Sequence, residues 1–473
     1  MIRVLLIKTP YLNTYGGLKN VASSYFPIGL GYIASVLRNS GFEVNILDPE
    51  VNSMNENAIR TVIRSFSPHV VGISCATPNI FEARDLAKIV KQETCATVVL
   101  GGPHASSLPS VTLEQLPEFD IVVYGEGEFS MLELCQVLKE GREQMQTVKG
   151  IAYRSNGVVL VNESRPWIRD LDQLPFPARD LLDIFLYKPQ TNMERGKKSA
   201  VIITSRGCPF RCTFCASHRT AGRIFRSHSP QYVISEMEHL IKNYGIEYFL
   251  IQDDEFTTNP QRIKKICQMI IDSGMKIEWW CHSRVDTVTE ELLLLMRKAG
   301  CVHISYGIES GNESILNNYQ KGISLEQCRQ TLKVSNRLGL KTHCFFIFGH
   351  MNETKQTIEQ SIRFAIELAP TMSSFAMLVP YPGTEEFERA NLNLRDINIW
   401  KDFVTVSGTP VISSKSLSKK RLQVYIAKAY MRFYFRPIQL MRILKNLSSF
   451  EELKAYNRGG LALLHQIVDW MRG

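Results

Sequence analysis

The segment SRGCPFRCTFCAS, residues 205–217, places three cysteines within eight residues, with the spacing C-x3-C-x2-C. A disulfide would use only two of these thiols, Cys208, Cys212 and Cys215. A tetrahedral zinc site would need a fourth ligand close by, for which His218 is one option. Three thiolates can instead bind three irons of a [4Fe–4S] cubane and leave the fourth iron open to a substrate. The spacing therefore favours chemistry at an iron–sulfur cluster.

The chain around this segment alternates between strand and helix patterns. Apolar runs typical of strands lie at 200–204, 247–252, 276–281, 301–306, 341–348 and 372–379. Helical patterns lie at 230–243, 260–273, 288–299, 324–338 and 354–368. Six β/α units predict a parallel barrel or a partial one, with its active site at the carboxyl ends of the strands. The cysteines follow the first of these strands, which places them at that end.

The first 140 residues show a second alternation of the same kind. Strands are predicted at 2–7, 43–47, 70–75, 97–102 and 120–125, and helices near 28–39, 55–66, 79–93 and 128–140. Five β-branched runs alternating with helices predict a flavodoxin-like doubly wound domain, whose ligand sits outside the carboxyl ends of the strands. Those ends are rich in glycine, proline and small residues, which let the backbone approach a large flat ligand closely.

Four regions follow from this pattern. We expect the doubly wound domain at 1–140, a connection at 141–195 with a hairpin that turns at Asn156-Gly157, the barrel at 196–400 and a helical region at 401–473. Beyond residue 400, 13 lysines and arginines stand against 4 aspartates and glutamates, a surplus equal to the +9 net charge of the whole chain. We expect this basic tail to pack on the barrel with a solvated face; docking on a substrate or a membrane surface is the alternative.

The composition also bears on the compartment and on partners. Eleven cysteines, odd in number and mostly dispersed, indicate reduced thiols. We find neither a cleavable signal nor a run of 18 apolar residues, so we expect a cytoplasmic protein without a transmembrane segment. The first 400 residues carry no net charge, and no compact RNA-binding module is evident, so no specific nucleic-acid partner is expected.

The cysteine motif, with Phe214 before its last cysteine, resembles the radical S-adenosylmethionine (SAM) superfamily. The resemblance implies that the open iron binds the amino and carboxylate groups of SAM. An external electron donor such as flavodoxin or ferredoxin would then drive cleavage to a 5′-deoxyadenosyl radical. LIQDDEFT, ISYGIESG and FFIFGH resemble the family's acidic, ribose-contacting and adenine-binding segments. The candidate SAM contacts are Phe214, Asp254, Glu255, Ser305, Glu309 and Gly349. A solvated helix cap is the alternative for each carboxylate.

The first 400 residues resemble the cobalamin-binding class of this superfamily. FPIGLGYIASVLRNSGFEVNILD, GGPHAS, YGEGE, WWCHSRVD and YPGTEEF carry the resemblance. It implies cobalamin at the doubly wound domain. The candidate contacts are Thr77, Gly101, Gly102, His104, Gly125, Glu126 and Gly127. Two departures stand out. The first loop, KTPYLNTYGGLKN, lacks the ligand His of a D-x-H-x-x-G pattern, and GHMNET (349–354) stands where members commonly have GLPGET.

The resemblance implies a cobalamin-dependent radical SAM enzyme, and methylation of an unactivated carbon of a small-molecule or lipid intermediate is the favoured reaction. A radical cyclase or ring-rearranging enzyme without methyl transfer is the alternative, and a non-catalytic cobalamin sensor is a third possibility. A methylthiotransferase fits less well, because Cys75, Cys95 and Cys135 do not form a second trio. We also expect both cofactors to open onto one cavity, lined by Trp280, His282, Arg284 and Tyr306.

Overall fold

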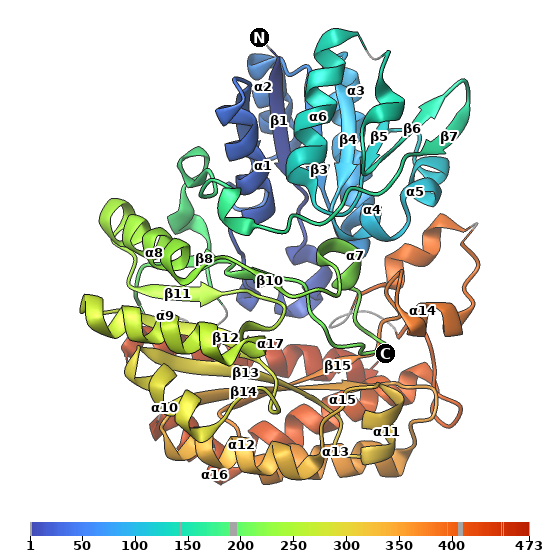
Figure 1. Ribbon diagram of the computed structural model, residues 1–473. Coiled ribbons are helices and arrows are strands. Elements are labelled where there is room, and N and C mark those ends of the chain that lie inside the picture. The colour runs from blue at the N-terminus through green and yellow to red at the C-terminus, as the bar shows by residue number, and fades with distance from the viewer. Residues whose placement is uncertain are drawn as a thin grey trace.

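The computed structural model describes residues 2–141, 143–189, 196–394, 396–404, 410–445, 447 and 449–472. Two sheets dominate it, one above the other in Figure 1. The upper strands run downward, so that their carboxyl ends face the lower sheet, whose strands lie across the picture. Parts of the predicted connection (142 and 190–195) and of the basic tail (405–409, 446, 448 and 473) lie outside the described residues.

The upper sheet has the predicted flavodoxin-like order, β2-β1-β3-β4-β5. Its strands are β1 Arg3–Lys8, β2 Glu43–Leu47, β3 Val70–Ser74, β4 Thr97–Gly101 and β5 Ile121–Val123. Its helices are α1 Ile28–Asn39, α2 Glu56–Phe66, α3 Ile80–Glu93, α4 Pro103–Ser107, α5 Pro109–Gln115 and α6 Gly127–Glu140. Helices cover both faces, so Leu5 and Ile7 join one apolar core while Val4 and Leu6 join the other. This explains why the strands read as continuous apolar runs.

A hairpin extends this sheet at one edge. β6 Ile151–Ser155 pairs antiparallel with β5, and β7 Val158–Val161 pairs with β6. Asn156 and Gly157 both have positive φ in the turn between them, as the sequence predicts.

The lower sheet is a six-stranded partial barrel. Its order is β8-β11-β12-β13-β14-β15, and every pairing is parallel. The strands are β8 Ser199–Ile202, β11 Tyr248–Ile251, β12 Glu278–Ser283, β13 Cys301–Glu309, β14 Lys341–Phe348 and β15 Met372–Met377. The covering helices are α8 Pro230–Tyr244, α9 Pro260–Ser273, α10 Glu290–Lys298, α12 Leu325–Arg337 and α13 Lys355–Leu368. Within the described residues β8 and β15 do not pair with each other, so the barrel stays open.

After β15 the chain returns to the upper domain. We call residues 379–404 the strap; it contains α14 Glu385–Ala390 and the 3-10 helix η9 Ile397–Asp402. Its side chains Val379, Phe387, Trp400 and Phe403 belong to the same apolar core as β3, β4 and α3. The strap therefore fastens the end of the barrel to the doubly wound domain.

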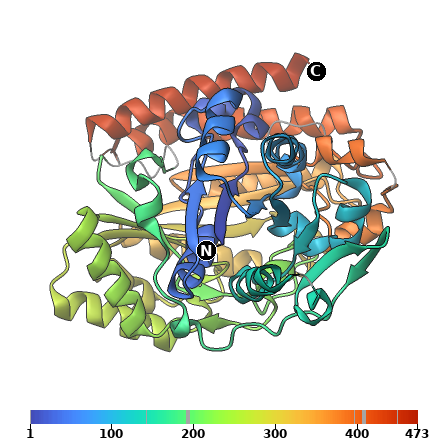
Figure 2. The same ribbon diagram turned by 90° about the horizontal axis from the view of Figure 1, so that it is seen from above.

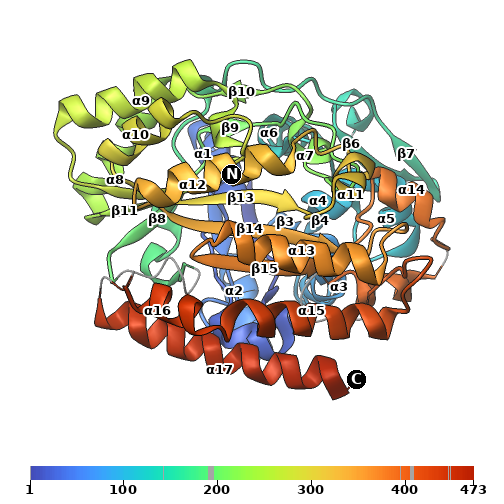
Figure 3. The ribbon, with the colours of Figure 1, turned by 90° about the horizontal axis from the view of Figure 1, so that it is seen from below.

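Three helices form the tail: α15 Lys419–Tyr434, α16 Pro437–Lys445 and α17 Phe450–Arg472. The hydroxyls of Tyr430 and Tyr434 accept hydrogen bonds from the backbone of β15, so α15 packs on the barrel as expected. α17 lies along one edge of the molecule (Figures 2 and 3), against α15 and against η1, a 3-10 segment at Leu12–Val21. None of the described helices is both long and apolar enough to cross a bilayer.

Candidate active site

The loop that carries the three cysteines is tightly held. The short hairpin β9 Ser205–Arg206 and β10 Arg226–Ser227 brackets it. Gly207 has φ 81°, and a Cβ there would lie 2.4 Å from the carbonyl oxygen of Ile224, so only glycine fits. Thr213 donates its N–H to the Tyr319 carbonyl (3.0 Å) and its hydroxyl to Glu386 (2.7 Å). The loop is thus fixed to β9 at one end and to the strap at the other.

The cysteines suit a cubane better than a single metal ion. Cys208, Cys212 and Cys215 are all half-buried and reduced. Within the described residues no set of three or more His, Cys, Asp or Glu side chains encloses a single metal ion. A cubane needs a wider arrangement, because each thiolate binds a different iron. Burial disfavours the thiolate and raises the pKa of Cys208 to about 12. Bonding to iron would lower this pKa again, because a coordinated thiol loses its proton.

Two cations stand beside the cysteines. The Arg284 guanidinium stacks on Phe210, 3.6 Å from the ring centroid, and its Nη1 lies 4.0 Å from Cys212 Sγ. The Lys321 ammonium is close enough to Cys212 to lower the pKa of that thiol, although burial, which raises it, is the larger effect. Each cation also pairs with a carboxylate at 2.8 Å, Arg284 with Asp286 and Lys321 with Glu309, so two ion pairs border the cysteine loop.

The acidic segment after β11 divides its three carboxylates between different tasks. Asp254 lines the cavity between the sheets and accepts the Gly207 N–H at 3.3 Å. Glu255 is buried and accepts hydrogen bonds from Thr257 and Thr287. These contacts favour a capping role for Glu255 over a contact with SAM. Asp253 was not predicted as a site residue. Its carboxylate receives the Thr204 N–H (2.6 Å) and the Ser205 hydroxyl (2.5 Å), and so fixes the turn that leads into the cysteine loop.

The other candidate SAM contacts lie on β13, just after β14 and on the cysteine loop. Ser305 accepts the Trp280 indole N–H at 2.8 Å inside the barrel. Glu309 has φ 69°, unusual for a residue with a side chain, and pairs with Lys321 at 2.8 Å. Gly349 has φ 112° and donates its N–H to Glu353. Phe214, within the cysteine loop itself, packs its ring on that of Tyr319 with centroids 5.1 Å apart. Their contacts with SAM stay predictions.

The departure at GHMNET buries a histidine beside the strap. His350 lies under the cysteine loop, with its ring 5.1 Å from that of Tyr319 and its Nε2 4.0 Å from Glu386 Oε1. Glu386 is also the acceptor for Thr213. His350 Nε2 is buried and makes no hydrogen bond within the described residues, and burial lowers the pKa of the ring, so a neutral imidazole fills the space between the rim of β14 and the strap.

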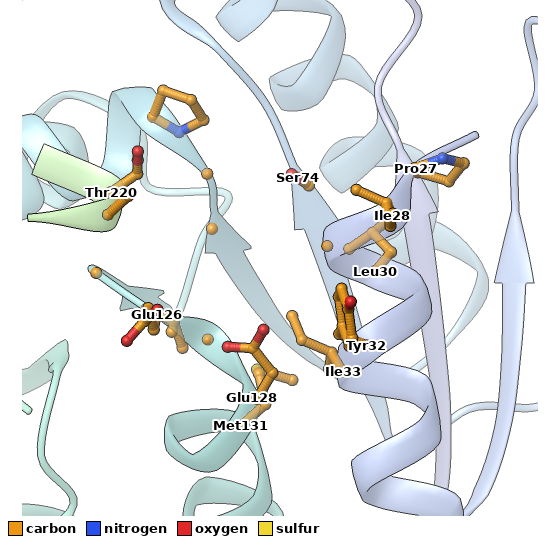
Figure 4. Close-up of a pocket in the computed structure, with 18 of the residues that line it drawn as sticks. Pro27, Ile28, Leu30, Tyr32, Ile33, Ser74, Glu126, Glu128, Met131 and Thr220 are labelled. Carbon is orange, nitrogen blue, oxygen red and sulfur yellow. The ribbon is translucent and has the colours of Figure 1, made fainter. Parts of the chain in front are cut away.

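One cavity of about 450 Å³ opens between the two sheets. Its walls include Gly101, Gly102, Gly125, Glu126 and Gly127 from the upper strand ends, all candidate cobalamin contacts. The lower domain contributes Ser205 of β9, together with Gln252 and Asp254, which follow β11. Figure 4 shows the part between α1 and α6, where Tyr32, Ile33 and Met131 flank the opening. The cavity also reaches down the sheet past Gly72, whose missing side chain leaves room beside Leu6.

The predicted site residue Glu126 joins the two domains. Its carboxylate pairs with Arg206 at 3.0 Å and with Arg226 at 2.9 Å, and it accepts the Ile168 N–H at 2.8 Å. Glu128 pairs with Arg206 at 2.6 Å. Both arginines belong to the hairpin that brackets the cysteine loop, so this buried network sets the position of the loop against the upper strand ends. No pattern in the sequence predicts these ion pairs.

Two further candidate cobalamin contacts lie behind the cavity wall. The His104 Nδ1 and the Thr77 hydroxyl are 3.1 Å apart, and neither residue lines the cavity. The His104 ring packs on Trp400 of the strap with centroids 5.1 Å apart. Burial lowers the pKa of His104 to about 4, so the ring is neutral at pH 7.

None of the four residues expected to line the cavity between the cofactors is among the residues that line the 450 Å³ cavity, although two of them lie in the barrel interior. Trp280 and His282 face inward with ring centroids 4.4 Å apart, and Arg284 sits at the rim against the cysteine loop. The expectation for Tyr306 is wrong. Successive strand residues alternate faces, so the neighbour of Ser305 points outward, and the Tyr306 hydroxyl contacts Ser335 of α12 at 3.0 Å.

Comparison with known families agrees with this geometry. The model of the radical SAM superfamily matches residues 202–365, and that of the B12 binding domain matches residues 16–134. An uncharacterized methyltransferase from Pyrococcus horikoshii is 35% identical over 93% of this chain and 94% of its own length. The chain is a cobalamin-binding member of the radical SAM superfamily.

This radical SAM enzyme has other relatives of the same architecture. An anaerobic magnesium-protoporphyrin IX monomethyl ester cyclase from Rubrivivax gelatinosus is 30% identical over 92% of the chain and 77% of its own length. The solved structure of the cobalamin-dependent radical enzyme OxsB, with aqua-cobalamin and SAM bound, superposes with a TM-score of 0.74 at 20% identity, over 99% of this chain and 72% of that one. The family's cofactors are a [4Fe–4S] cluster, SAM and cobalamin, and its chemistry requires a reductant.

Proposed function

We propose that this enzyme transfers a methyl group to an unactivated carbon of a biosynthetic intermediate. The cavity between the upper strand ends and Asp254 supports the proposal, because Asp254 accepts the Gly207 N–H beside the cysteine trio and the transfer needs one carbon within reach of both cofactors. SAM at a reduced cluster supplies a radical that removes hydrogen, and cobalamin supplies the methyl group. The name of the Pyrococcus horikoshii relative supports methyl transfer.

The protein's own side chains would position the reactants. Cys208, Cys212 and Cys215 would hold the cluster, and Arg284 and Lys321 would balance its charge.

The glycines that line the cavity at the upper strand ends would let the corrin lie close to the backbone, because they present no side chain to it. Trp280 and His282 would exclude water from the reacting carbon.

Cobalamin would bind without an imidazole ligand to cobalt. The first loop contains no histidine, and His104 is held between Thr77 and Trp400. Paramagnetic resonance of the cob(II)alamin form should therefore lack nitrogen coupling from an imidazole. Coupling that disappears in His104→Ala would show that His104 moves to the cobalt and would contradict this prediction.

A radical cyclase is the second candidate, because the Rubrivivax gelatinosus relative is named as one. Methyl-labelled SAM separates the two even before a substrate is known. A methyltransferase incubated with cobalamin and reductant should place the label on protein-bound cobalamin and release S-adenosylhomocysteine. Formation of 5′-deoxyadenosine with no label on cobalamin would exclude methyl transfer and favour the cyclase.

Compartment, electron donor and substrate class are proposed on chemical grounds. The free cysteines and the oxygen sensitivity of such clusters favour the cytoplasm, with flavodoxin or ferredoxin as donor. The substrate would be a small molecule or a lipid, because the first 400 residues carry no net charge to attract nucleic acid. Salt-sensitive retention of the enzyme on RNA would contradict the last point.

A further inference from the structure

The tail exposes an unusual concentration of apolar side chains. Ten of the large apolar residues that the described chain leaves exposed lie at or beyond Phe435, against eight in all the preceding sequence. On α16 they are Ile438, Leu440, Met441 and Leu444, each between 49% and 64% exposed. Scattered exposed apolar residues are ordinary, but clusters of this kind mark interaction sites.

α17 carries a second exposed apolar stripe. Leu461, Leu464, Val468 and Met471 follow a spacing of three, four and three residues, so they lie on one helix face and all are exposed. The opposite face of α17 packs on α15, where the Trp470 ring stacks on Tyr430 with centroids 5.9 Å apart. α17 is therefore apolar on two sides, and only one side is covered within the described chain.

The exposed apolar face is bordered by positive charge. Residues 419–445 contain eight lysines and arginines and no aspartate or glutamate. The Arg436 Nε bonds the Phe433 carbonyl, and an Arg442 Nη bonds the Gln439 side chain. Neither arginine, nor Lys445, forms an ion pair with a carboxylate of the described residues. Burial, and for Arg436 also the charge of Arg442, lowers the pKa of both guanidiniums, as expected for cations that lack a counter-charge.

We propose that the exposed faces of α16 and α17 form a docking surface for an anionic lipid bilayer. The eight apolar side chains named above and Arg436, Arg442 and Lys445 make up this surface, which we call the tail patch. Apolar side chains would enter the acyl boundary while the arginines and the lysine meet lipid phosphates, as in helices that lie in the membrane interface. The two helices follow one another across residues 446–449 and lie at the same outer edge in Figure 3.

Two other occupants fit less well. A second copy of the chain would bring one basic surface against another. An acidic electron donor would dock far from the cluster, because α16 lies at the amino end of β15, where Gln439 bonds the Thr371 carbonyl at 2.8 Å. The cysteines lie at the carboxyl ends of the strands.

The test is co-sedimentation of the full-length enzyme with lipid vesicles. It should sediment with vesicles of phosphatidylglycerol and phosphatidylcholine, not with phosphatidylcholine alone, and high salt should release it. Replacing both Met441 and Leu444 with serine, which keeps the charge, should lower vesicle partitioning about tenfold. Each Arg442→Gln or Lys445→Gln change should lower it about fivefold.

The matched control replaces Ile271 and Leu294 with serine, because these residues are 38% and 41% exposed on the barrel helices α9 and α10. This variant should partition like the wild type. Absence of vesicle binding, or equal loss in both double variants, would overturn the proposal. So would self-association that the tail variant abolishes without any vesicle binding, or reduction by flavodoxin that only the tail variant impairs. None of these measurements depends on the reaction proposed above.

Discussion

Replacing Glu126 by alanine should destabilise the contact between the two domains. The side chains of Glu126, Arg206 and Arg226 are 5%, 12% and 6% exposed, so little solvent screens their ion pairs. Removing one partner of a buried pair costs about 3–5 kcal/mol, because the other charge stays buried without compensation. Arg206 would keep its ion pair with Glu128. Arg226 would lose the carboxylate with which it pairs, and the Ile168 N–H would lose its hydrogen-bond acceptor. We therefore expect a loss within that range.

Urea unfolding followed by tryptophan fluorescence would measure the loss, and cobalamin retained after gel filtration would report the cavity. Glu133→Ala is the control: Glu133, on α6, pairs with Arg165 in the segment after β7, and these two side chains are 35% and 21% exposed. Loss of that pair should cost less than about 1 kcal/mol. Equal destabilisation by the two variants would refute the claim that the Glu126 network joins the domains.

Three further outcomes are expected. Replacing Cys208, Cys212 or Cys215 by alanine should abolish 5′-deoxyadenosine formation, whereas Cys267→Ala on α9 and Cys328→Ala on α12 should retain it. The reconstituted enzyme should contain about four irons per chain, and about eight would contradict a single cluster. Trp280→Ala removes the donor to Ser305 and should keep SAM cleavage while product is lost; a parallel fall of both would exclude Trp280 from the substrate cavity. Burial raises the pKa of Glu353 from 4.5 to about 8, so the folded state holds a proton that the unfolded state releases, and stability should fall as pH rises across that window. Glu353→Gln should remove this slope in thermal melts, and an unchanged slope would assign it to another group.

The regular elements were largely predictable because burial shapes their sequence directly. The expected helix at 28–39 matches α1, since Pro27 precedes it and Gly41 follows. The strands of both sheets agree within a few residues, because strands covered by helices on both faces must be apolar throughout. The cysteine trio was predictable for a different reason: its three ligands are neighbours in the sequence.

The parts that were missed depend on contacts between distant residues. Glu126 pairs with Arg206 and Arg226, which lie 80 and 100 residues away in the sequence, and no local pattern predicts ion pairs at such separations. Trp400 reads as a lone aromatic residue until it is seen against His104. Tyr306 was assigned to the wrong face, because a fully buried strand shows no polar alternation that would reveal which side is inward. The proposed domain boundaries at 140, 195 and 400 stay predictions.

The strap also constrains how this enzyme can be divided. The upper domain takes part of its core from residues that follow the barrel, so a fragment ending near residue 195 would expose the surface that Phe387, Trp400 and Phe403 cover. α17 adds a second constraint, since Gln466 lies against Gly17 with only 3.1 Å left for a Cβ. A chimera that exchanges the cobalamin half between relatives would therefore have to exchange two separate pieces of chain, one from each side of the barrel. A single crossover would leave the exchanged upper domain packed against the strap and α17 of the other relative.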